Sequence, residues 1–480
     1  MMPSTNNAPA GDCRSVDFPY DLDTLVEDRV AEGIFRVNRK VFTDREIFEA
    51  EVLHIFESTW LFIGLESQIP KPHDFITMVM GRQPVILMRD ANGKLGAFYN
   101  SCKHRGAVVC PYRSGNQRVH VCRYHGWTYG SDGRNSGVAQ SKDGQYPAAF
   151  AKEDHGLTPI AKLDSYRGFI FGSLSADVPS LQEHLGEAKA ILDLVVDQSP
   201  HGVEYVPGGV TYTFDANWKL QFENGLDYYH FATTHASYMD VMQHRLKTGA
   251  VEQPRTYEDT ATEEAAGSYG FERGHALMYA IRKQGRVHVR PLANDPGALE
   301  EIRARVGETK AKWMLRQRNL TIYPNLQIVD ISSQQLRTWR PLAPNKTEMV
   351  SHCLAPIGEG EAAREMRIRN YEDFFNPTGL GSSDDNLMYE YVQAGYEASE
   401  AGDTQGYVRG LGAAVAQADP FARELGISPE SWAYGPITFG DESCMQGGYR
   451  EWRRLIARGL ERQRANNKDI PIASQPGEES

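Results

Sequence analysis

The chain of 480 residues has no long apolar run and no excess of positive charge. No segment approaches the roughly 20 apolar residues that a membrane-spanning helix needs, and the opening MMPSTNNAPAGDC lacks the charged and apolar parts of a secretory signal. Acidic residues outnumber basic ones by 63 to 51, giving a formal net charge of −12, which argues against a nucleic acid or an anionic membrane as partner. We therefore expect a soluble cytoplasmic protein that acts on a small molecule or binds another protein.

Cysteine is also scarce, with six residues in the whole chain, which excludes a disulfide scaffold. Three of the six fall together with three histidines in the stretch CKHRGAVVCPYRSGNQRVHVCRYHG, which begins at Cys102 and ends at Gly126. In a cytoplasmic protein, such clustering indicates a metal site. The remaining cysteines, Cys13, Cys353 and Cys444, are predicted to be ordinary residues.

The spacing divides this stretch into two mixed arms. Cys102 and His104 form a C-x-H arm, seventeen residues follow, and Cys122 and His125 form a C-x-x-H arm. Zinc is the alternative metal, but zinc modules usually pair Cys with Cys in one arm and His with His in the other. A Rieske [2Fe-2S] cluster instead needs two thiolates on one iron and two imidazoles on the other, which explains mixed arms. The sequences C-K-H-R-G and C-R-Y-H-G-W resemble the Rieske motif.

Cys110 and His120 lie inside this span but fit neither arm, so we predict structural roles for both. Short β-forming runs surround the motif: FITMVMG, PVILMRD and KLGAFYN precede it, and YRGFIFGSL follows it. We place the cluster domain at residues 57–176. A larger domain is assigned to 177–466 together with the N-terminal part, 1–56, and residues 467–480 are expected to form a polar tail.

The larger domain has mixed α+β character. Apolar residues at helical spacing predict a helix between Pro179 and Gln198, and further helices are predicted at 298–318, 363–375, 386–399 and 449–466. Between them, RNLTIYPNLQIVDISSQQLRTWRPLAPNKTEMVSHCLAP predicts three consecutive strands of an antiparallel sheet. The fold class is therefore α+β, with an antiparallel sheet flanked by helices.

A second group of metal-ligating residue types lies in NWKLQFENGLDYYHFATTHASYMD, which starts at Asn217. Asp227 and His230 are three residues apart and share a helix face, whereas His235 lies roughly 140° further round an ideal helix. Both histidines could therefore bind one metal only if the helix ends or is distorted near Thr233 and Thr234. Taken alone, these histidines could equally be core or surface residues.

The pattern E-N-G-L-D-Y-Y-H-x-x-x-x-H after N-W-K resembles the mononuclear iron motif of Rieske non-haem iron aromatic-ring-hydroxylating oxygenases, large (α) subunit. The resemblance implies an all-β Rieske domain inserted before a larger catalytic domain of helix-grip type. It also implies that His230, His235 and a downstream aspartate ligate the iron as a facial triad. The matching stretch FFNPTGLGSSDDNLMYE offers Asp384 and Asp385. The family pattern favours Asp385, whereas spacing alone does not choose between them.

The same resemblance assigns further roles. Asp227 is expected to connect the two metal centres by bonding His230 and, across a subunit boundary, His125 of a neighbouring chain. Asn224 is expected to approach the iron, and Phe375 and Met239 are candidates for the substrate pocket, although each is equally plausible as core packing.

The segments GRQPVILMRD, RNLTIYP and YEDFFNPTGLGSSDD are most similar to the branch that contains benzoate, toluate, anthranilate and 2-halobenzoate dioxygenases. This resemblance implies an α3β3 heterohexamer with a small β subunit, in which the α chains form a head-to-tail ring. It also implies electrons from NADH through an iron-sulfur flavoprotein reductase, with or without a ferredoxin, and a cis-dihydrodiol product that feeds catechol degradation. Dioxygenation of aniline and monohydroxylation of salicylate are alternatives. The rival classes are an electron-transfer protein without a second iron and a zinc-stabilised binding module.

Overall fold

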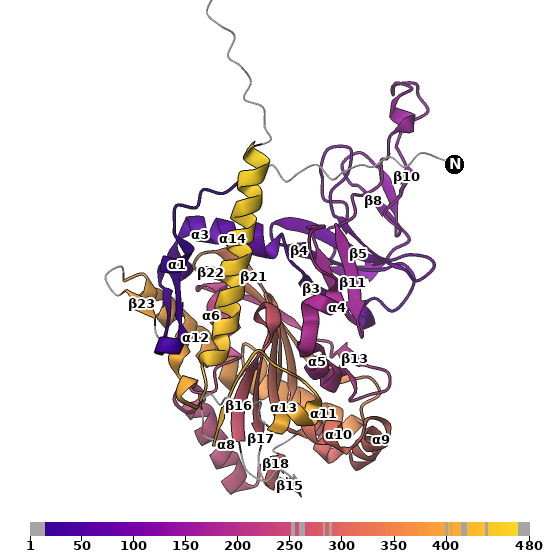
Figure 1. Ribbon diagram of the computed structural model, residues 1–480. Coiled ribbons are helices and arrows are strands. Elements are labelled where there is room, and N and C mark those ends of the chain that lie inside the picture. The colour runs from indigo at the N-terminus through magenta and orange to yellow at the C-terminus, as the bar shows by residue number, and fades with distance from the viewer. Residues whose placement is uncertain are drawn as a thin grey trace, which may run out of the picture.

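The structure is a computed structural model that describes residues 15–250, 255–258, 265–281, 284–287, 290–398, 402–404, 406–413, 420–436 and 440–468 (Figure 1). Cys13 and most of the predicted polar tail lie outside the described residues. Helix α14 (Gln446–Lys468) includes the first two residues assigned to that tail. Within the described ranges, no helix combines the length and the apolar character that crossing a bilayer requires.

Residues 57–176, all of which the structure describes, form small antiparallel sheets joined by loops and two 3-10 turns. The predicted strands around Phe75 and Tyr99 are confirmed, because the longest sheet has the order β6-β5-β4-β7. The other two sheets have the orders β10-β9-β8 and β11-β12-β3. The strands are β3 (Leu61–Leu65), β4 (Asp74–Met80), β5 (Gln83–Arg89), β6 (Leu95–Tyr99), β7 (Ser114–Asn116), β8 (Val119–Val121), β9 (Thr128–Gly130), β10 (Asn135–Gly137), β11 (Lys162–Tyr166) and β12 (Phe169–Ser173). The domain boundaries at 57 and 176 stay predictions.

A nine-stranded antiparallel sheet dominates the described part of the rest of the chain, in the order β13-β22-β21-β20-β19-β17-β16-β24, with β14 also paired to β22. Along β22, buried and less buried residues alternate, as expected where only one face of a strand is covered. The strands are β13 (Val203–Tyr205), β14 (Val210–Phe214), β16 (Ala265–Gly270), β17 (Ala276–Ile281), β19 (Gln317–Ile322), β20 (Leu326–Asp330), β21 (Gln334–Ala343), β22 (Lys346–Pro356) and β24 (Ser431–Gly435). One further sheet has the order β1-β2-β23, with β1 (Val26–Arg29), β2 (Ile34–Asn38) and β23 (Asp403–Thr404). Another sheet pairs β15 (Arg255–Glu258) with β18 (Gln284–Val287).

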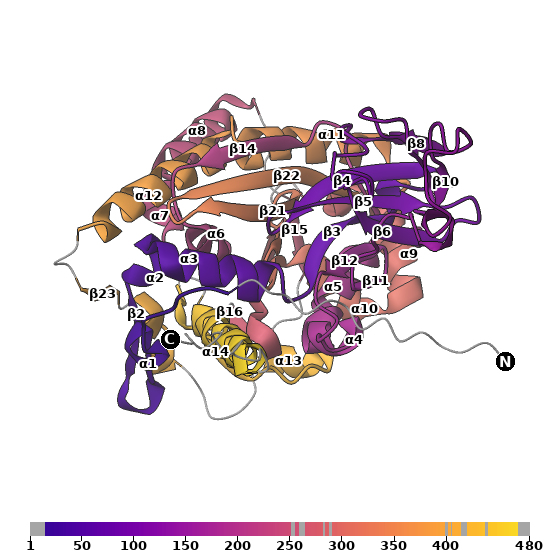
Figure 2. The ribbon, with the colours of Figure 1, turned by 90° about the horizontal axis from the view of Figure 1, so that it is seen from above.

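Helices flank the large sheet, so the α+β class is confirmed. Seen from above, α8, α11 and α12 lie on one side of β21 and β22, and α3 and α14 lie on the other (Figure 2). The helices are α1 (Leu22–Leu25), α2 (Lys40–Thr43), α3 (Arg45–Glu51), α4 (Leu181–Leu185), α5 (Lys189–Val196), α6 (Trp218–Asn224), α7 (Phe231–Thr234), α8 (Ala236–Thr248), α9 (Pro296–Val306), α10 (Glu308–Leu315), α11 (Glu361–Asn370), α12 (Leu380–Tyr396) and α13 (Pro420–Leu425). A π-helical turn, η8 (Tyr371–Phe375), continues α11.

Four sequence-based predictions need correction. The helix expected between Pro179 and Gln198 is interrupted at Gly186, which has φ of 48°, and forms α4 and α5. The helix expected at 298–318 is two helices, because Gly307 has φ of 89° between α9 and α10. The long run that begins at Arg318 contains four strands instead of three, since Pro324 and Asn325 form a turn between β19 and β20. The helix expected from Asn386 begins earlier, at Leu380.

The N-terminal segment packs against the larger domain. Buried residues between Leu25 and Phe56 share one apolar cluster with Trp218 of α6 and Trp452 of α14. Glu51 accepts hydrogen bonds from both indole nitrogens and forms a buried ion pair with Lys219. Burying a carboxylate is costly unless it is paired, so these contacts tie three distant segments together.

Candidate metal centres

The two cysteine-histidine arms fold into loops with the same backbone pattern. In each loop, the N–H of the cysteine donates to the carbonyl five residues later, and the glycine four residues on donates back to the cysteine carbonyl. These glycines, Gly106 and Gly126, have φ of 74° and 71°, a conformation that glycine adopts without steric cost. The glycine at the end of each arm therefore closes a tight loop around the ligand side chains.

The histidine rings of the two loops lie against each other. The rings of His104 and His125 are 4.4 Å apart, centroid to centroid, and the side chains of Cys102 and Cys122 are both buried. The Nδ1 atom of His104 is buried without a hydrogen-bond partner, which suits a nitrogen that faces a metal. Desolvation, together with the charges of His104 and Arg105, lowers the pKa of His125, which favours the neutral ring that binds metals.

Trp127 and Tyr129 are contacts of the cluster loops that the sequence analysis missed. The ring of His104 stacks on Trp127, with centroids 4.9 Å apart, and the hydroxyl of Tyr129 lies 3.1 Å from the sulfur of Cys102. The only signal in the sequence is their position directly after the second arm. Cys110 and His120 are buried in the same region, and His120 packs edge-on against Phe75, as expected for structural residues.

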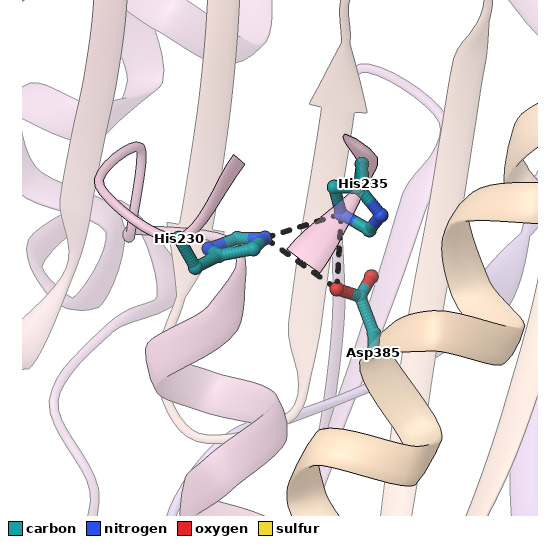
Figure 3. Close-up of side chains that lie close together, drawn as sticks. All are labelled: His230, His235 and Asp385. Carbon is teal, nitrogen blue, oxygen red and sulfur yellow. Dashed lines mark hydrogen bonds and ion pairs between the residues drawn. The ribbon is translucent and has the colours of Figure 1, made fainter. Parts of the chain in front are cut away.

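A second group of ligand atoms converges in the larger domain (Figure 3). The Nε2 atoms of His230 and His235 are 3.3 Å apart, and Oδ1 of Asp385 lies 3.4 Å from the first and 3.2 Å from the second. Among the described residues, this is the one group of three or more His, Cys, Asp or Glu side chains whose ligand atoms all lie within 4.8 Å of one another. Two imidazoles and one carboxylate are the donor set of non-haem iron sites that leave positions open for oxygen.

A break in the helix brings the two histidines together. α7 ends at Thr234 and α8 begins at Ala236, and His235 between them has φ of −102° and ψ of 28°, outside the α-helical range. The condition under which both histidines could bind one metal, a helix that ends near Thr233 and Thr234, is therefore met. It removes the 140° offset that an ideal helix would impose.

The structure separates the two candidate aspartates on α12. Asp385 is 4% exposed and directs Oδ1 toward both Nε2 atoms, whereas Asp384 is more exposed and its Oδ2 lies 3.6 Å from Nδ1 of His235. The geometry therefore favours Asp385 as the ligand. Asp384 lies beside the nitrogen that faces away from the other two ligands.

Asp227 holds His230 from the opposite side. Its Oδ2 lies 3.1 Å from Nδ1 of His230, and its Oδ1 accepts hydrogen bonds from the N–H groups of Tyr229 and His230. Asn224, one turn earlier, donates from Nδ2 to Oδ1 of Asp385 at 3.0 Å. Both residues thus contact candidate ligands, as the family pattern implies.

These contacts set the protonation of the group. Burial lowers the pKa of His230, but hydrogen bonds to Asp227 and Asp385 outweigh burial and raise this pKa to about 10. Burial would raise the pKa of Asp385, whereas hydrogen bonds to His230 and His235 hold it well below 3.8. Both shifts have one cause, the close approach of the carboxylate and the imidazoles.

The two predicted pocket residues occupy different environments. Phe375 is 1% exposed and belongs to an apolar cluster that also contains Phe374, whereas Met239 is 38% exposed on α8. Phe374 is the aromatic residue nearer to the candidate ligands, since its ring centroid lies 5.1 Å from that of His235. The sequence offers no signal that distinguishes these adjacent phenylalanines.

Comparison with known proteins agrees with both groups of residues. Residues 59–150 match the family described as Rieske [2Fe-2S] domain, and residues 204–458 match the family described as ring hydroxylating alpha subunit (catalytic domain). Toluate 1,2-dioxygenase subunit alpha of Pseudomonas putida is 38% identical, with coverage of 92% of this chain and 95% of that relative.

Two further relatives and a solved structure are similar over almost the whole chain. The large subunit of 2-halobenzoate 1,2-dioxygenase of Burkholderia cepacia is 38% identical, over 92% of this chain and 93% of its own. The large subunit of anthranilate 1,2-dioxygenase of Acinetobacter baylyi is also 38% identical, over 94% and 95%. The crystal structure of naphthalene 1,2-dioxygenase from Rhodococcus sp. bound to indole superposes with a TM-score of 0.73 at 26% identity, over 88% of this chain and 94% of that one.

The residues present fit the two cofactors of this family, a Rieske [2Fe-2S] cluster and a mononuclear non-haem iron. Paired cysteines and histidines supply the first donor set, and two histidines with one carboxylate supply the second. The chain belongs to the Rieske ring-hydroxylating dioxygenases, as an α subunit that carries both the cluster domain and the catalytic domain.

Proposed function

We propose that this α subunit cis-dihydroxylates a monocyclic aromatic acid of the benzoate, toluate, anthranilate or 2-halobenzoate type, with O2 as oxidant and NADH as the ultimate electron donor. The observation that carries the proposal is the convergence of His230, His235 and Asp385 in a chain that also has the Rieske loops. The names of the three relatives support the substrate class, because toluate, 2-halobenzoate and anthranilate all carry a carboxylate on a single benzene ring.

The ligand assignments are part of this proposal. Cys102, His104, Cys122 and His125 hold the cluster, and His230, His235 and Asp385 hold the iron. When bound, these groups supply one-electron transfer and oxygen activation. The chain's own residues orient and shield the reacting groups: Asp227 fixes the ring of His230, and Phe374, which packs on Tyr238, covers the ring of His235.

We further propose that α subunits assemble head to tail, with a small β subunit, as α3β3. Both views place β8 and β10, beside the cluster loops, at one side of the molecule and α8 at the other, which favours transfer between neighbouring chains (Figures 1 and 2). Large apolar side chains are exposed at both places, as expected for surfaces that a neighbour covers. They are Val108, Tyr112, Val119, Val121 and Tyr124 at the cluster loops, and Tyr229, Met239, Leu387, Tyr391 and Val392 near the iron site.

The electron donor is proposed from the resemblance to this family. An NADH-dependent iron-sulfur flavoprotein reductase, with or without a ferredoxin, would convert two-electron hydride chemistry into the single electrons that a Rieske cluster accepts. In this scheme, Asp227 connects His230 of one chain to His125 of its neighbour. Its side chain is partly exposed, which leaves it accessible to a second chain.

The test is coupled NADH and O2 consumption by the α and β subunits, reconstituted with iron and reductase, followed by identification of the product. The substrates compared are benzoate, anthranilate, 2-chlorobenzoate, salicylate and aniline. We expect tight coupling and a cis-diol or catechol with at least one of the first three acids. Coupling to aniline alone, or a monohydroxylated salicylate, would contradict the proposed substrate class and favour the corresponding alternative.

Two variants separate an oxygenase from the rival classes. His230→Ala should retain the visible Rieske spectrum and lose turnover, whereas His125→Ala should lose the spectrum as well. Iron analysis should give three irons per wild-type chain, two in the cluster and one mononuclear. Turnover that survives in His230→Ala would refute the assigned iron site.

A further inference from the structure

A buried arginine lies behind the candidate iron ligands. Arg337, on β21, is 5% exposed. Its Nε donates to Oε1 of Gln335 at 2.6 Å, and its Nη1 donates to Oδ1 of Asn224 at 3.0 Å. Arg337 also hydrogen-bonds the side chain of Tyr389. The two amides and the phenol are uncharged, so these bonds do not neutralise the charge of the buried guanidinium. Burial of a cation at this cost suggests a role beyond packing.

The arginine determines which way the amide of Asn224 points. An amide has an oxygen that accepts hydrogen bonds and a nitrogen that donates them, whereas a guanidinium only donates and a carboxylate only accepts. Arg337 on one side of Asn224 therefore requires Oδ1 to face it. The nitrogen then faces Asp385, where Nδ2 donates to Oδ1 at 3.0 Å.

The oxygen that Asn224 holds is the one placed for metal binding. Oδ1 of Asp385 lies within 3.4 Å of both imidazole Nε2 atoms, and Nδ2 of Asn224 is itself 3.4 Å from Nε2 of His230. A hydrogen bond to this oxygen occupies one of its lone pairs and fixes the carboxylate plane. The orientation of Asn224 therefore determines how Asp385 presents its oxygens.

The arginine is itself fixed by the sheet. Gln335, two residues earlier on β21, accepts from Arg337 and donates from Nε2 to Oγ of Ser351 at 2.7 Å and to the carbonyl of Phe375 at 2.8 Å. Ser351 lies opposite Arg337 in the pairing of β21 with β22. Hydrogen bonds thus connect the strand pair and η8 to the guanidinium and, through Asn224, to Asp385.

We propose that Arg337 is a positioning residue of the iron site: it sets the orientation of Asn224, and Asn224 holds Oδ1 of Asp385 in the geometry that ligates iron. This inference rests on the proposed ligand role of Asp385. It adds a residue 48 positions before that ligand in the sequence, on a strand that supplies no ligand itself. Because it acts through Asn224, substitution should alter the metal coordination before it alters the fold.

The experiment compares Arg337→Met, Asn224→Ala and their double variant in the holoenzyme. The readouts are the EPR spectrum of the ferrous site with nitric oxide as probe and the rate of loss of mononuclear iron to a chelator. We expect both single variants to change the nitrosyl spectrum in the same way and to weaken iron retention by about 10- to 100-fold. The double variant should resemble Asn224→Ala, because Arg337 has no further effect on Asp385 once the side chain of Asn224 is gone.

Arg340→Gln is the matched control, since Arg340 lies on the same strand and pairs with Glu348 away from the site. It should match the wild type in both readouts, and the Rieske spectrum reports folding in every variant. If Arg337→Met does not fold, Arg337→Lys replaces it. That variant keeps a donor for Asn224 and should retain a spectrum closer to the wild type than Asn224→Ala does.

The proposal is overturned if Arg337→Met gives the wild-type nitrosyl spectrum, or if Arg337→Lys changes the spectrum as much as Asn224→Ala does. It is also overturned if the effects of Arg337→Met and Asn224→Ala add in full in the double variant. A separate variant tests the underlying assignment, because Asp385→Ala should deplete mononuclear iron and Asp384→Ala should retain it. If Asp385→Ala retains iron, the ligand assignment fails, whatever the arginine variants show.

Discussion

The hydroxyl of Tyr129 is placed to adjust the reduction potential of a cluster bound by the two loops. The hydroxyl of Tyr129 lies 3.1 Å from the sulfur of Cys102 and accepts a hydrogen bond from the N–H of Lys103. A hydroxyl that accepts from this backbone group directs its own hydrogen elsewhere, and the sulfur is within reach. Hydrogen bonds to cluster sulfurs stabilise the reduced, more negative state and so raise the reduction potential.

Tyr129→Phe should therefore lower the reduction potential of the cluster. If the bond is about 1 kcal/mol stronger in the reduced state, the decrease is roughly 40 mV for a one-electron couple. Redox titration followed by visible spectroscopy measures the change. Tyr146→Phe is the control in the same domain, because Tyr146 stacks on Phe150 instead. An unchanged potential in Tyr129→Phe would show that the hydroxyl does not act on the sulfur.

Another residue-scale effect concerns acid stability. Burial lowers the pKa of His352 from 6.5 to about 4, and its ring stacks on Tyr205 with a centroid distance of 4.0 Å. Because this pKa is lower in the folded state, the neutral ring contributes full stability above pH 6.5, and that contribution is lost as the pH falls toward 4. The shift corresponds to roughly 3 kcal/mol at most.

His352→Phe preserves the stacked ring but cannot bind a proton. We expect the free energy of unfolding of this variant to fall less than that of the wild type between pH 6.5 and pH 4. Urea titrations at several pH values give the comparison. Parallel curves for the two proteins would mean that His352 does not contribute to acid destabilisation.

At the scale of elements, the contact between α12 and the π-helical turn η8 positions the iron site. A methyl group added at Gly381 would lie 2.6 Å from the ring of Phe374, which is tighter than packed side chains allow. That ring also contacts His235, and α12 carries Asp385. Displacement of the ring would therefore affect both ligands.

Gly381→Ala should destabilise the protein by about 1–3 kcal/mol and reduce mononuclear iron, with the Rieske spectrum unchanged. Gly395→Ala is the matched control in the same helix, because no atom lies within 4 Å of its added methyl group. It should stabilise slightly, since alanine favours a helix interior over glycine. Equal iron contents in the two variants would refute the proposed role of this packing.

The sequence predicts those elements of the architecture that depend on residue type and local spacing. The strands around Phe75 follow from local pattern, and the preference for Asp385 follows from family resemblance. The break at His235 entered only as a condition for both histidines to bind one metal. The split at Gly307 and the turn at Pro324 were not predicted, because a single glycine or proline has several possible roles in a periodic segment.

Contacts between segments that are distant in the sequence cannot be predicted from residue type and local spacing. Arg337 meets Asn224 across 113 residues, and Tyr129 meets Cys102 only after both loops fold. Neither pair shares a helix face or a strand face, so no periodicity connects them. The candidate pocket residue Phe375 shows the same limit, since only the fold reveals that its neighbour Phe374 contacts His235.

For the whole molecule, the separation of the two centres predicts that function depends on a neighbouring chain. The proposed ring can be tested by coexpressing His125→Ala chains, which lack an intact cluster, with Asp385→Ala chains, which lack the iron site. In a head-to-tail ring, a His125→Ala chain keeps its iron site and works only if the neighbour that donates electrons is an Asp385→Ala chain. Half of the chains keep an iron site, and half of those have such a neighbour. Random mixing should then restore about one quarter of wild-type activity.

Each variant alone should be inactive in this assay, and a mixture of separately purified rings should be inactive too if chains do not exchange. A coexpressed assembly without activity would indicate that electrons pass within one chain. Size-exclusion chromatography with mass measurement, carried out in parallel, shows whether mixed assemblies have formed.

The pairing of β3 with β12 has a wider consequence. The chain leaves the catalytic core along β3 and returns along β12, and these strands are hydrogen-bonded antiparallel neighbours. Everything between them, including both cluster loops, is therefore one insertion whose two chain connections lie side by side, and contacts such as the ion pair between Arg82 and Glu49 add to this attachment. Such an attachment lets evolution exchange or retune the electron carrier while the oxygen-activating core keeps its shape.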